Sequence, residues 1–157
     1  MAADAIDVLK DVLGPQATAS SVVHGVAVFE IAPTTLTGFV ERLKRDFGFD
    51  IFLDVTAVDW LPATPRFEIV WHFYSTAHKI RVRLKARVPE NASVVDSLVG
   101  LYGSARFMER ECHDMYGIGF RGNADLRPIL LYEGFEGHPL RKDYDKAREQ
   151  PLVPYRT

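Results

Sequence analysis

The 157-residue chain has the length of one ordinary domain and can bury a hydrophobic core without disulfides or metals. Hydrophobic residues make up 47% and charged residues 25%, a composition that excludes a disordered or fibrous protein. Lys and Arg number 19 against 21 Asp and Glu, so the net charge of -2 gives no reason to expect nucleic acid or an anionic membrane as a partner.

Cysteine content and hydropathy set further limits. Cys112 is the one cysteine, so the chain has no internal disulfide and lacks the several thiolates that a zinc site or an iron–sulfur cluster needs. The first residues include acids and no long apolar run, unlike a signal peptide, and no stretch approaches the ~20 apolar residues that cross a bilayer. We expect a soluble protein of a reducing compartment with no direct membrane span.

The first elements along the chain are a helix, a hairpin and a second helix. Apolar residues at helical spacing predict a helix over 2–13, which Gly14-Pro15 ends. β-branched residues on both sides of a tight turn predict a hairpin over 20–31. Residues 36–47 carry the clearest helical pattern, and Gly48 ends it. Burying its five apolar side chains, at about 1.5–3 kcal/mol each, would hold this helix against a sheet.

Three strands follow. Residues 50–58 are apolar on most of both faces, which predicts a central strand. Residues 66–74 and 79–88 alternate in polarity and predict an antiparallel hairpin. The outer face of the last strand carries five cations: Lys79, Arg81, Arg83, Lys85 and Arg87. Such a face binds phosphate backbones in some proteins, but no aromatic residue alternates with these cations, so a solvated face that resists aggregation is the favoured interpretation.

Two more helices and an irregular segment complete the chain. A short helix is predicted over 94–102 and a longer one over 105–116, which Gly117 ends. Glycine and proline then interrupt every periodic stretch. We predict an α+β fold for residues 1–120, a two-layer sandwich of a mostly antiparallel or mixed sheet with helices on one face. Residues 121–157 are predicted to form an extended C-terminal docking arm that is not an independent domain.

The densest polar cluster lies in the last predicted helix. Cys112, His113 and Asp114 are consecutive and point about 100° apart, which argues against a metal site or a nucleophile–base pair. Glu111 and Asp114 share a face with Phe107, and a half-buried acid needs a cation or donors because an unpaired one costs several kcal/mol. We therefore favour an ion-pair network that clamps the arm onto the helix over a catalytic acid, with the following cations as partners: Arg121, Arg127, Arg141 and Lys142.

No other pattern predicts chemistry. The remaining histidines stand singly without ligand spacing, and no phosphate-binding loop or dinucleotide fingerprint occurs. The residues themselves thus predict an α+β module with no catalytic, cofactor-binding or metal-binding residues of its own, whose irregular arm is held by something else.

Three blocks of the sequence carry a resemblance to a known family. They are 109–120 (ERECHDMYGIGF), 125–130 (DLRPIL) and 136–144 (EGHPLRKDY). Their order and spacing are similar to those of the 30 kDa subunit, also called the C subunit, of NADH:quinone oxidoreductase, respiratory complex I. Weaker upstream similarities are found at residues 54–59, 66–74 and 93–94, so the resemblance covers nearly the whole chain.

The resemblance implies a non-catalytic structural subunit of the peripheral arm of a proton-translocating enzyme, which supports electron transfer from NADH to quinone. FMN, iron–sulfur clusters and quinone would be bound by partner subunits, with no cofactor on this chain. The implied partners are the hydrogenase-like D subunit at the quinone site and the cluster-bearing B and I subunits, with no nucleic acid. The implied location is the cytoplasmic face of the bacterial inner membrane, reached peripherally through the complex.

The resemblance also implies which residues form the ionic clamp and dock partners: Glu109, Arg110, Glu111, Asp114, Gly117, Arg127, Gly137, His138, Pro139, Arg141, Lys142 and Asp143. Two alternatives stay open. One is the equivalent subunit of a related membrane-bound hydrogenase or formate hydrogenlyase. The other, of a different class, is a free-standing nucleic-acid-binding module that uses the basic strand 79–87.

Overall fold

The computed structural model of the chain describes residues 2–147 and 150. Helices and strands follow one another as α1 (Ala2–Leu13), β1 (Ala19–Val23), β2 (Val26–Glu30), α2 (Leu36–Phe47), β3 (Ile51–Asp59), β4 (Phe67–Ser75), β5 (Ile80–Val88), β6 (Val94–Asp96), α3 (Ala105–Tyr116) and β7 (Gly119–Arg121). The last part of the predicted arm, residues 148–149 and 151–157, lies outside the described residues.

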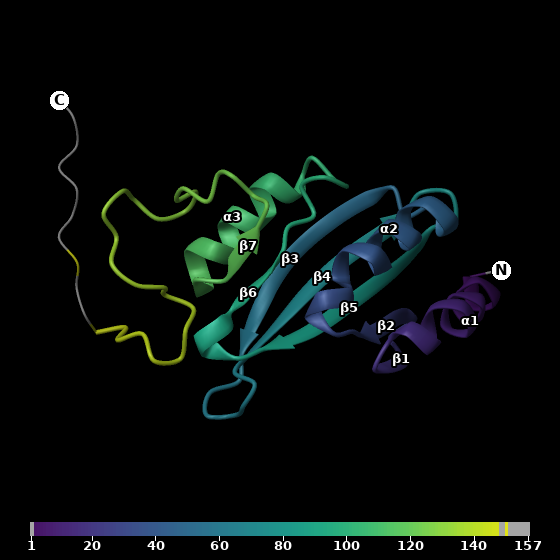
Figure 1. The fold of residues 1–157 in the computed structure, drawn as a ribbon, viewed down its shortest axis with the longest axis horizontal. Helices are drawn as coiled ribbons and strands as arrows, with labels where there is room; N and C mark the ends of the chain where they lie inside the picture. The colour runs from purple at the N-terminus through teal and green to yellow at the C-terminus, as the bar shows by residue number, and fades with distance from the viewer. Residues whose placement is uncertain (1, 148–149, 151–157) are drawn as a thin grey trace.

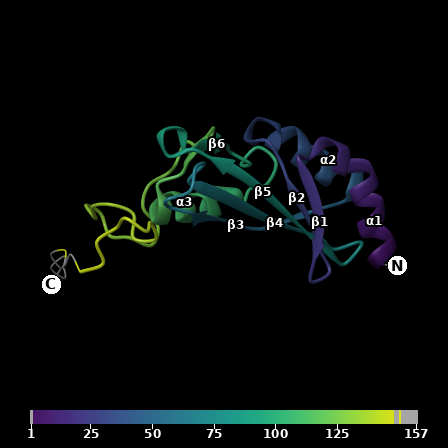
Figure 2. The ribbon, with the colours of Figure 1, turned by 90° about the horizontal axis from the view of Figure 1, so that it is seen from below.

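A five-stranded mixed sheet organises the fold. Its strand order is β1-β2-β5-β4-β3, with β2 and β5 parallel and the other pairs antiparallel. Figures 1 and 2 show α1 and α2 at one end of this sheet and α3 at the other. The predicted α+β class with a mixed sheet is confirmed, as are the two hairpins and the helices that begin at Ala2, Leu36 and Ala105.

The core forms where the inward face of the sheet meets the helices. Alternate residues of β4, among them Phe67, Trp71 and Phe73, are fully buried. The predicted apolar face of α2 is buried against them, and Gly48 ends the helix with a left-handed φ of 65° that a side chain would disfavour. Hydrophobic periodicity therefore located this part of the core correctly.

The prediction that residues 50–58 form a central strand is wrong, because β3 lies at the edge of the sheet. Its inward residues are buried, but Ile51, Leu53 and Val58 are 36–38% exposed. A run that is apolar on most of both faces shows only that both faces are poor in charge. It does not show that both faces are covered.

The helix predicted over 94–102 is also wrong. Val94 and Val95 belong to β6, which pairs in parallel with β7 from beyond α3. β-branched valines suit this strand, and the pairing partner is remote in sequence, so helical spacing alone misassigned the segment. Leu98 and Tyr102, which gave the helical pattern, are still buried, but they flank a turn at residues 99–101.

The residues that follow α3 form an irregular loop at the α3 end of the molecule (Figure 1). After β7, residues 122–147 contain no helix or strand. β7 itself runs across the predicted boundary at residue 120, and the division into 1–120 and 121–157 stays a prediction. Within the part of the chain that the structure describes, no helix is long and apolar enough to cross a membrane.

Candidate functional site

The candidate site is the surface along which α3 and the β3–β4 connection hold residues 123–147; we call it the arm seam. Two acids of α3 are buried here, Glu109 (0% exposed) and Asp114 (6%). Glu111 is exposed, and Phe107, which was expected beside it on the inward face, is 55% exposed. The buried stripe of α3 instead contains Ala105, Glu109 and Cys112, so the prediction that paired Glu111 with Asp114 is wrong.

Asp114 anchors the arm through its backbone. One carboxylate oxygen accepts hydrogen bonds from the N–H groups of Ile129, Leu130 and Leu131 at 3.0, 2.9 and 3.0 Å. Burial alone would raise the pKa of Asp114, but these donors favour the charged form and hold the pKa below its ordinary value. The carboxylate therefore fixes three consecutive residues of the arm at once.

The arm also caps the end of α3. The last carbonyls of a helix have no partner within it, and the carbonyl end carries partial negative charge. Here His138 Nδ1 donates to the carbonyl of Asp114 at 2.9 Å, the Leu140 N–H to that of Met115 at 3.1 Å, and Arg141 Nε to that of Tyr116 at 2.6 Å. Three helix carbonyls are thus satisfied by one short stretch that includes Pro139.

Gly117 makes this cap possible. Its φ of 72° is left-handed, and a Cβ at this position would lie 2.5 Å from His138 Nε2 and 2.6 Å from Arg141 Nη2. Glycine is therefore required both by the backbone turn and by the close approach of the arm. At Gly137, with φ of 93°, a Cβ would meet the ring of Tyr144 at 3.1 Å.

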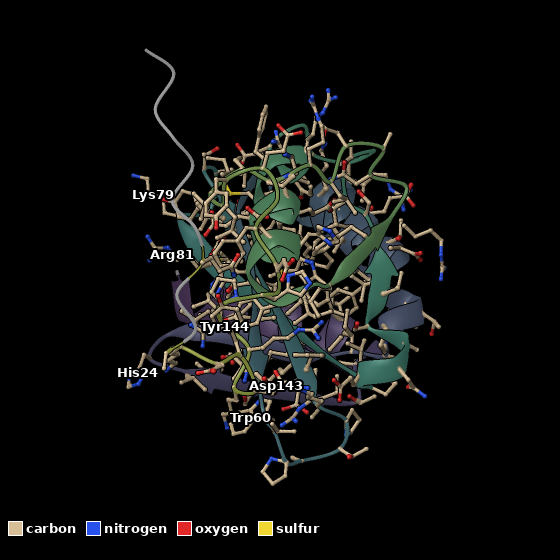
Figure 3. All side chains as sticks on the ribbon, turned by 90° about the vertical axis from the view of Figure 1, so that its left-hand side faces the viewer. His24, Trp60, Lys79, Arg81, Asp143 and Tyr144 are labelled. Carbon is tan, nitrogen blue, oxygen red and sulfur yellow. The ribbon has the colours of Figure 1, made fainter. Side chains whose placement is uncertain are left out.

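A buried arginine, directly before β4, forms the second anchor. The side chain of Arg66 is 5% exposed, and it donates to Asp59 at 3.0 and 2.7 Å. It also donates to Asp143 of the arm at 2.9 and 2.7 Å and to Glu90 at 2.6 Å. The backbone N–H of Lys142 donates to Asp59 at 2.8 Å, so both partners of the central pair hold the arm; Figure 3 labels Asp143 at this junction.

Sequence reasoning missed Asp59, Arg66 and Glu90 as members of the clamp. Asp59 and Arg66 lie in upstream segments that resemble the family, which is the signal that was available. Their role needed tertiary information, because 77 residues separate Arg66 from Asp143.

Acid is expected to loosen this junction. Hydrogen bonds from Arg66 hold the pKa of Asp59 well below its usual value, and they lower that of Asp143 in the same way. A depressed folded-state pKa contributes stability that is fully present above about pH 4 and is lost as the pH falls through the folded-state value. Carboxyl-carbon NMR titration should give low pKa values for both aspartates. The midpoint temperature of thermal unfolding should decrease as the pH is lowered below about 4. Titration of both at an ordinary pKa would contradict this account.

The other residues of the predicted clamp form hydrogen bonds to backbone groups more often than to one another. Arg110 donates to the carbonyls of Arg127 and Pro128 at 2.9 and 2.8 Å. The Arg127 side chain pairs with Asp125 at 2.8 Å, and Lys142 Nζ donates to the carbonyl of Leu61 at 3.1 Å.

Glu109 accepts from the Ser97 hydroxyl, the Leu98 N–H and the Asn123 amide at 2.7, 2.7 and 2.9 Å. Burial raises its pKa, and these three donors oppose the rise. Among the described residues, none of the predicted arm cations pairs with an acid of α3. At α3 the predicted ion pairs are thus replaced by hydrogen bonds between charged side chains and backbone groups, which satisfy carbonyls and amides that a loop leaves unpaired. Paired charges occur instead around Arg66.

The distal part of the arm closes on itself. Gln150 accepts from the Glu136 N–H at 3.0 Å and donates to the Glu136 carbonyl at 2.8 Å and to the Tyr144 hydroxyl at 3.0 Å. The Phe135 and Tyr144 rings stack with centroids 6.1 Å apart, and Tyr132 packs edge-on against Phe135. These contacts define the shape of the loop within the chain.

The thiol of Cys112 is expected to be inert. The residue is 2% exposed, and burial raises the pKa of its thiol well above the usual value, with Asp54, Glu109 and Glu111 raising it further. Because the thiolate is the reactive form, iodoacetamide should label the native chain about a hundredfold more slowly than the chain in concentrated urea. Mass spectrometry of both reactions measures the ratio, and equal rates would contradict this assignment.

The described residues contain no group of three His, Cys, Asp or Glu that could hold a metal.

The fold and the seam define a class of protein: a small α+β scaffold whose irregular C-terminal segment is fixed onto its last helix. Comparison with known families identifies it further. Residues 29–150 match the family described as respiratory-chain NADH dehydrogenase, 30 Kd subunit, and the chain belongs to this family.

Curated relatives agree with this assignment. The chain is 45% identical over 123 residues to the C 2 subunit of NADH-quinone oxidoreductase from Rhizobium meliloti (strain 1021), a match that covers 77% of this chain and 67% of the relative. It is 44% identical over 127 residues to the C subunit of the same enzyme from Rhodobacter capsulatus, a match that covers 80% and 63%. The chain therefore spans about two thirds of the length of these relatives. The resemblance seen in the sequence is confirmed.

Solved structures share the fold. A trypsin-resistant fragment of Nqo5 superposes with a TM-score of 0.69 at 25% identity, covering 80% of this chain and all of the fragment. A chain of the membrane-bound sulfane sulfur reductase, an archaeal respiratory membrane complex, gives a TM-score of 0.79 at 26% identity, covering 90% of this chain and 85% of that one.

Proposed function

We propose that this chain is a non-catalytic structural subunit of the peripheral arm of NADH:quinone oxidoreductase. The observation that carries the proposal, beside family membership, is the arm seam: Asp114, Arg66 and the α3 cap fix an irregular loop so that it presents one defined surface. Ordering a loop costs about 1–2 kcal/mol per residue in entropy, and these contacts offset part of that cost within the subunit. A pre-ordered loop then binds neighbours with less loss of entropy.

The cofactors of the complex belong, in this proposal, to neighbouring subunits. FMN, iron–sulfur clusters and quinone would be held by partners, with the hydrogenase-like D subunit at the quinone site and the cluster-bearing B and I subunits adjoining this chain. We further propose that it associates peripherally, through the complex, with the cytoplasmic face of the bacterial inner membrane. The relatives named as subunits of NADH-quinone oxidoreductase support assembly with other subunits of that enzyme.

The fold by itself does not select this complex over a related one, since a chain of the sulfane sulfur reductase has the same fold. The identities of 44–45% to NADH-quinone oxidoreductase subunits favour complex I. The nucleic-acid alternative is not favoured, because Glu68 already pairs with Lys85 and Arg87 at 2.9 and 3.3 Å on the cationic face.

Affinity purification of the tagged full chain from native membranes tests the proposal. We expect the D, B and I subunits to co-purify with NADH:quinone activity. Co-purification with a hydrogenase-like subunit that retains nickel-ligating cysteines would instead identify the related hydrogenase. Protease treatment of inverted and right-side-out vesicles reports which side of the membrane the chain faces. Recovery of the chain alone from these membranes would contradict a subunit role.

A further inference from the structure

The outer face of the sheet, on the side away from the core, has an uneven charge distribution. Alternate residues of β5 point to this face, and at one end Lys85 and Arg87 share the carboxylate of Glu68. Arg87 also lies over the ring of Trp60 at 4.8 Å. Both cations at this end are therefore paired with an acid and held in place.

The arginines at the other end differ in their pairing. Neither Arg81 nor Arg83 forms an ion pair with an acid of the described residues, and the buried Nε–H of Arg83 has no acceptor there. His72 stands opposite Arg83, and Asp54 stands opposite His72. Burial lowers the pKa of His72, and Arg83 lowers it further despite the nearby carboxylate of Asp54. Figure 3 shows Lys79 and Arg81 projecting from the margin of the molecule.

Apolar groups adjoin these arginines. Tyr74 stands opposite Arg81 on one side and opposite Ile51, which is 38% exposed, on the other. Arginine and tyrosine beside exposed apolar side chains are typical of protein interfaces. Alternate residues of a strand lie about 6.6 Å apart, which matches acids at alternate positions of an extended segment or on successive turns of a helix, about 6 Å apart.

We propose that Arg81 and Arg83 bind the carboxylates of an acidic segment of an adjoining subunit. This inference rests on the proposed function, because it needs the assembled complex. Asp54 and Glu68 lie on the same face, so an evenly spaced line of phosphates along the sheet would meet them. A segment whose carboxylates stand only opposite Arg81 and Arg83 avoids this repulsion. The partner segment thus supplies the ion-pair acceptors that Arg81 and Arg83 lack among the described residues.

Zero-length cross-linking tests the inference in the assembled complex. The variant R81K/R83K keeps both charges and introduces amines that carbodiimide joins to carboxylates in contact with them. We expect mass spectrometry to find cross-links from position 81 or 83 to Asp or Glu of a neighbouring subunit. The matched control is R42K/R45K on the exposed face of α2, where the arginines pair with acids of their own helix. It should give cross-links within the chain only.

Three outcomes would overturn the inference. The first is cross-links from positions 81 and 83 only to Asp54 of the same chain, and the second is cross-links only to a second copy of this chain. The third is ready acetylation of the lysines at positions 81 and 83 in the assembled complex, which would show that no partner covers them. Failure of the wild-type chain to co-purify with any subunit would contradict the proposed function instead, so the two failures are distinguishable.

Retention in salt provides an independent measurement. Neutralising both arginines in R81Q/R83Q should lower the affinity of the complex for this subunit, and so its retention, roughly tenfold at moderate ionic strength. R42Q/R45Q makes the same change in net charge on α2 and should leave retention unchanged. Equal retention of the two variants would overturn the role of Arg81 and Arg83.

Discussion

The variant R66Q is expected to lose more stability than any other single substitution in the arm seam. The Asp59 side chain is 3% exposed and pairs with a guanidinium that is itself 5% exposed. Removing one partner of a buried ion pair leaves the other charge uncompensated, which costs about 3–5 kcal/mol. Asp143 and Glu90 lose the same partner, so the arm is released as well.

Urea unfolding of the full chain gives the free energy of unfolding, and limited proteolysis gives the accessibility of the arm. R66K should recover little of the lost free energy of unfolding, because an ammonium cannot form two parallel hydrogen bonds to each of two carboxylates. The matched control is R87Q, whose arginine pairs with Glu68 at a side-chain exposure of 38% and should cost less than about 1 kcal/mol. Equal unfolding midpoints for R66Q and R87Q would show that the junction does not support the fold.

Replacement of Asp114 by alanine should detach the arm locally. The three N–H groups of Ile129, Leu130 and Leu131 lose their shared acceptor, and a hydrogen bond to a charged group contributes about 1.5–3 kcal/mol. Because other contacts anchor the arm, we expect local opening and not global unfolding. Amide hydrogen exchange of these three residues should accelerate about a hundredfold, with a smaller change in the core strands.

Two further variants make the result specific. D114N keeps an oxygen that can accept hydrogen bonds, so its exchange rate at residues 129–131 should lie between those of wild type and D114A. E111Q changes an exposed acid of the same helix that forms no ion pair with the described residues, and the exchange of residues 129–131 in E111Q should match that of wild type. If D114A leaves the exchange of residues 129–131 unchanged, Asp114 is not the anchor. In the assembled complex we expect D114A, but not E111Q, to lower the yield of complete enzyme.

The sequence by itself determined the class of fold, the helices around Leu36 and Ala105, the hairpins and the family. Each of these rests on local signals. The spacing of Leu36, Phe39, Val40 and Leu43 defines one buried face whatever else surrounds it, and Gly48 and Gly117 mark helix ends because they adopt left-handed φ values. The signature blocks likewise located the segments that form the arm seam, including Asp114, His138 and Arg141.

Tertiary structure alone decided how those residues act. The strand at Val94 forms because its partner, β7, returns from beyond α3, and β3 becomes an edge strand through the order of the whole sheet. Asp114 meets backbone N–H groups where arm cations had been expected, and Arg66 becomes the anchor for Asp143. Periodicity reports which side chains avoid water. It does not report which polar group across the fold will occupy the space beside a buried charge.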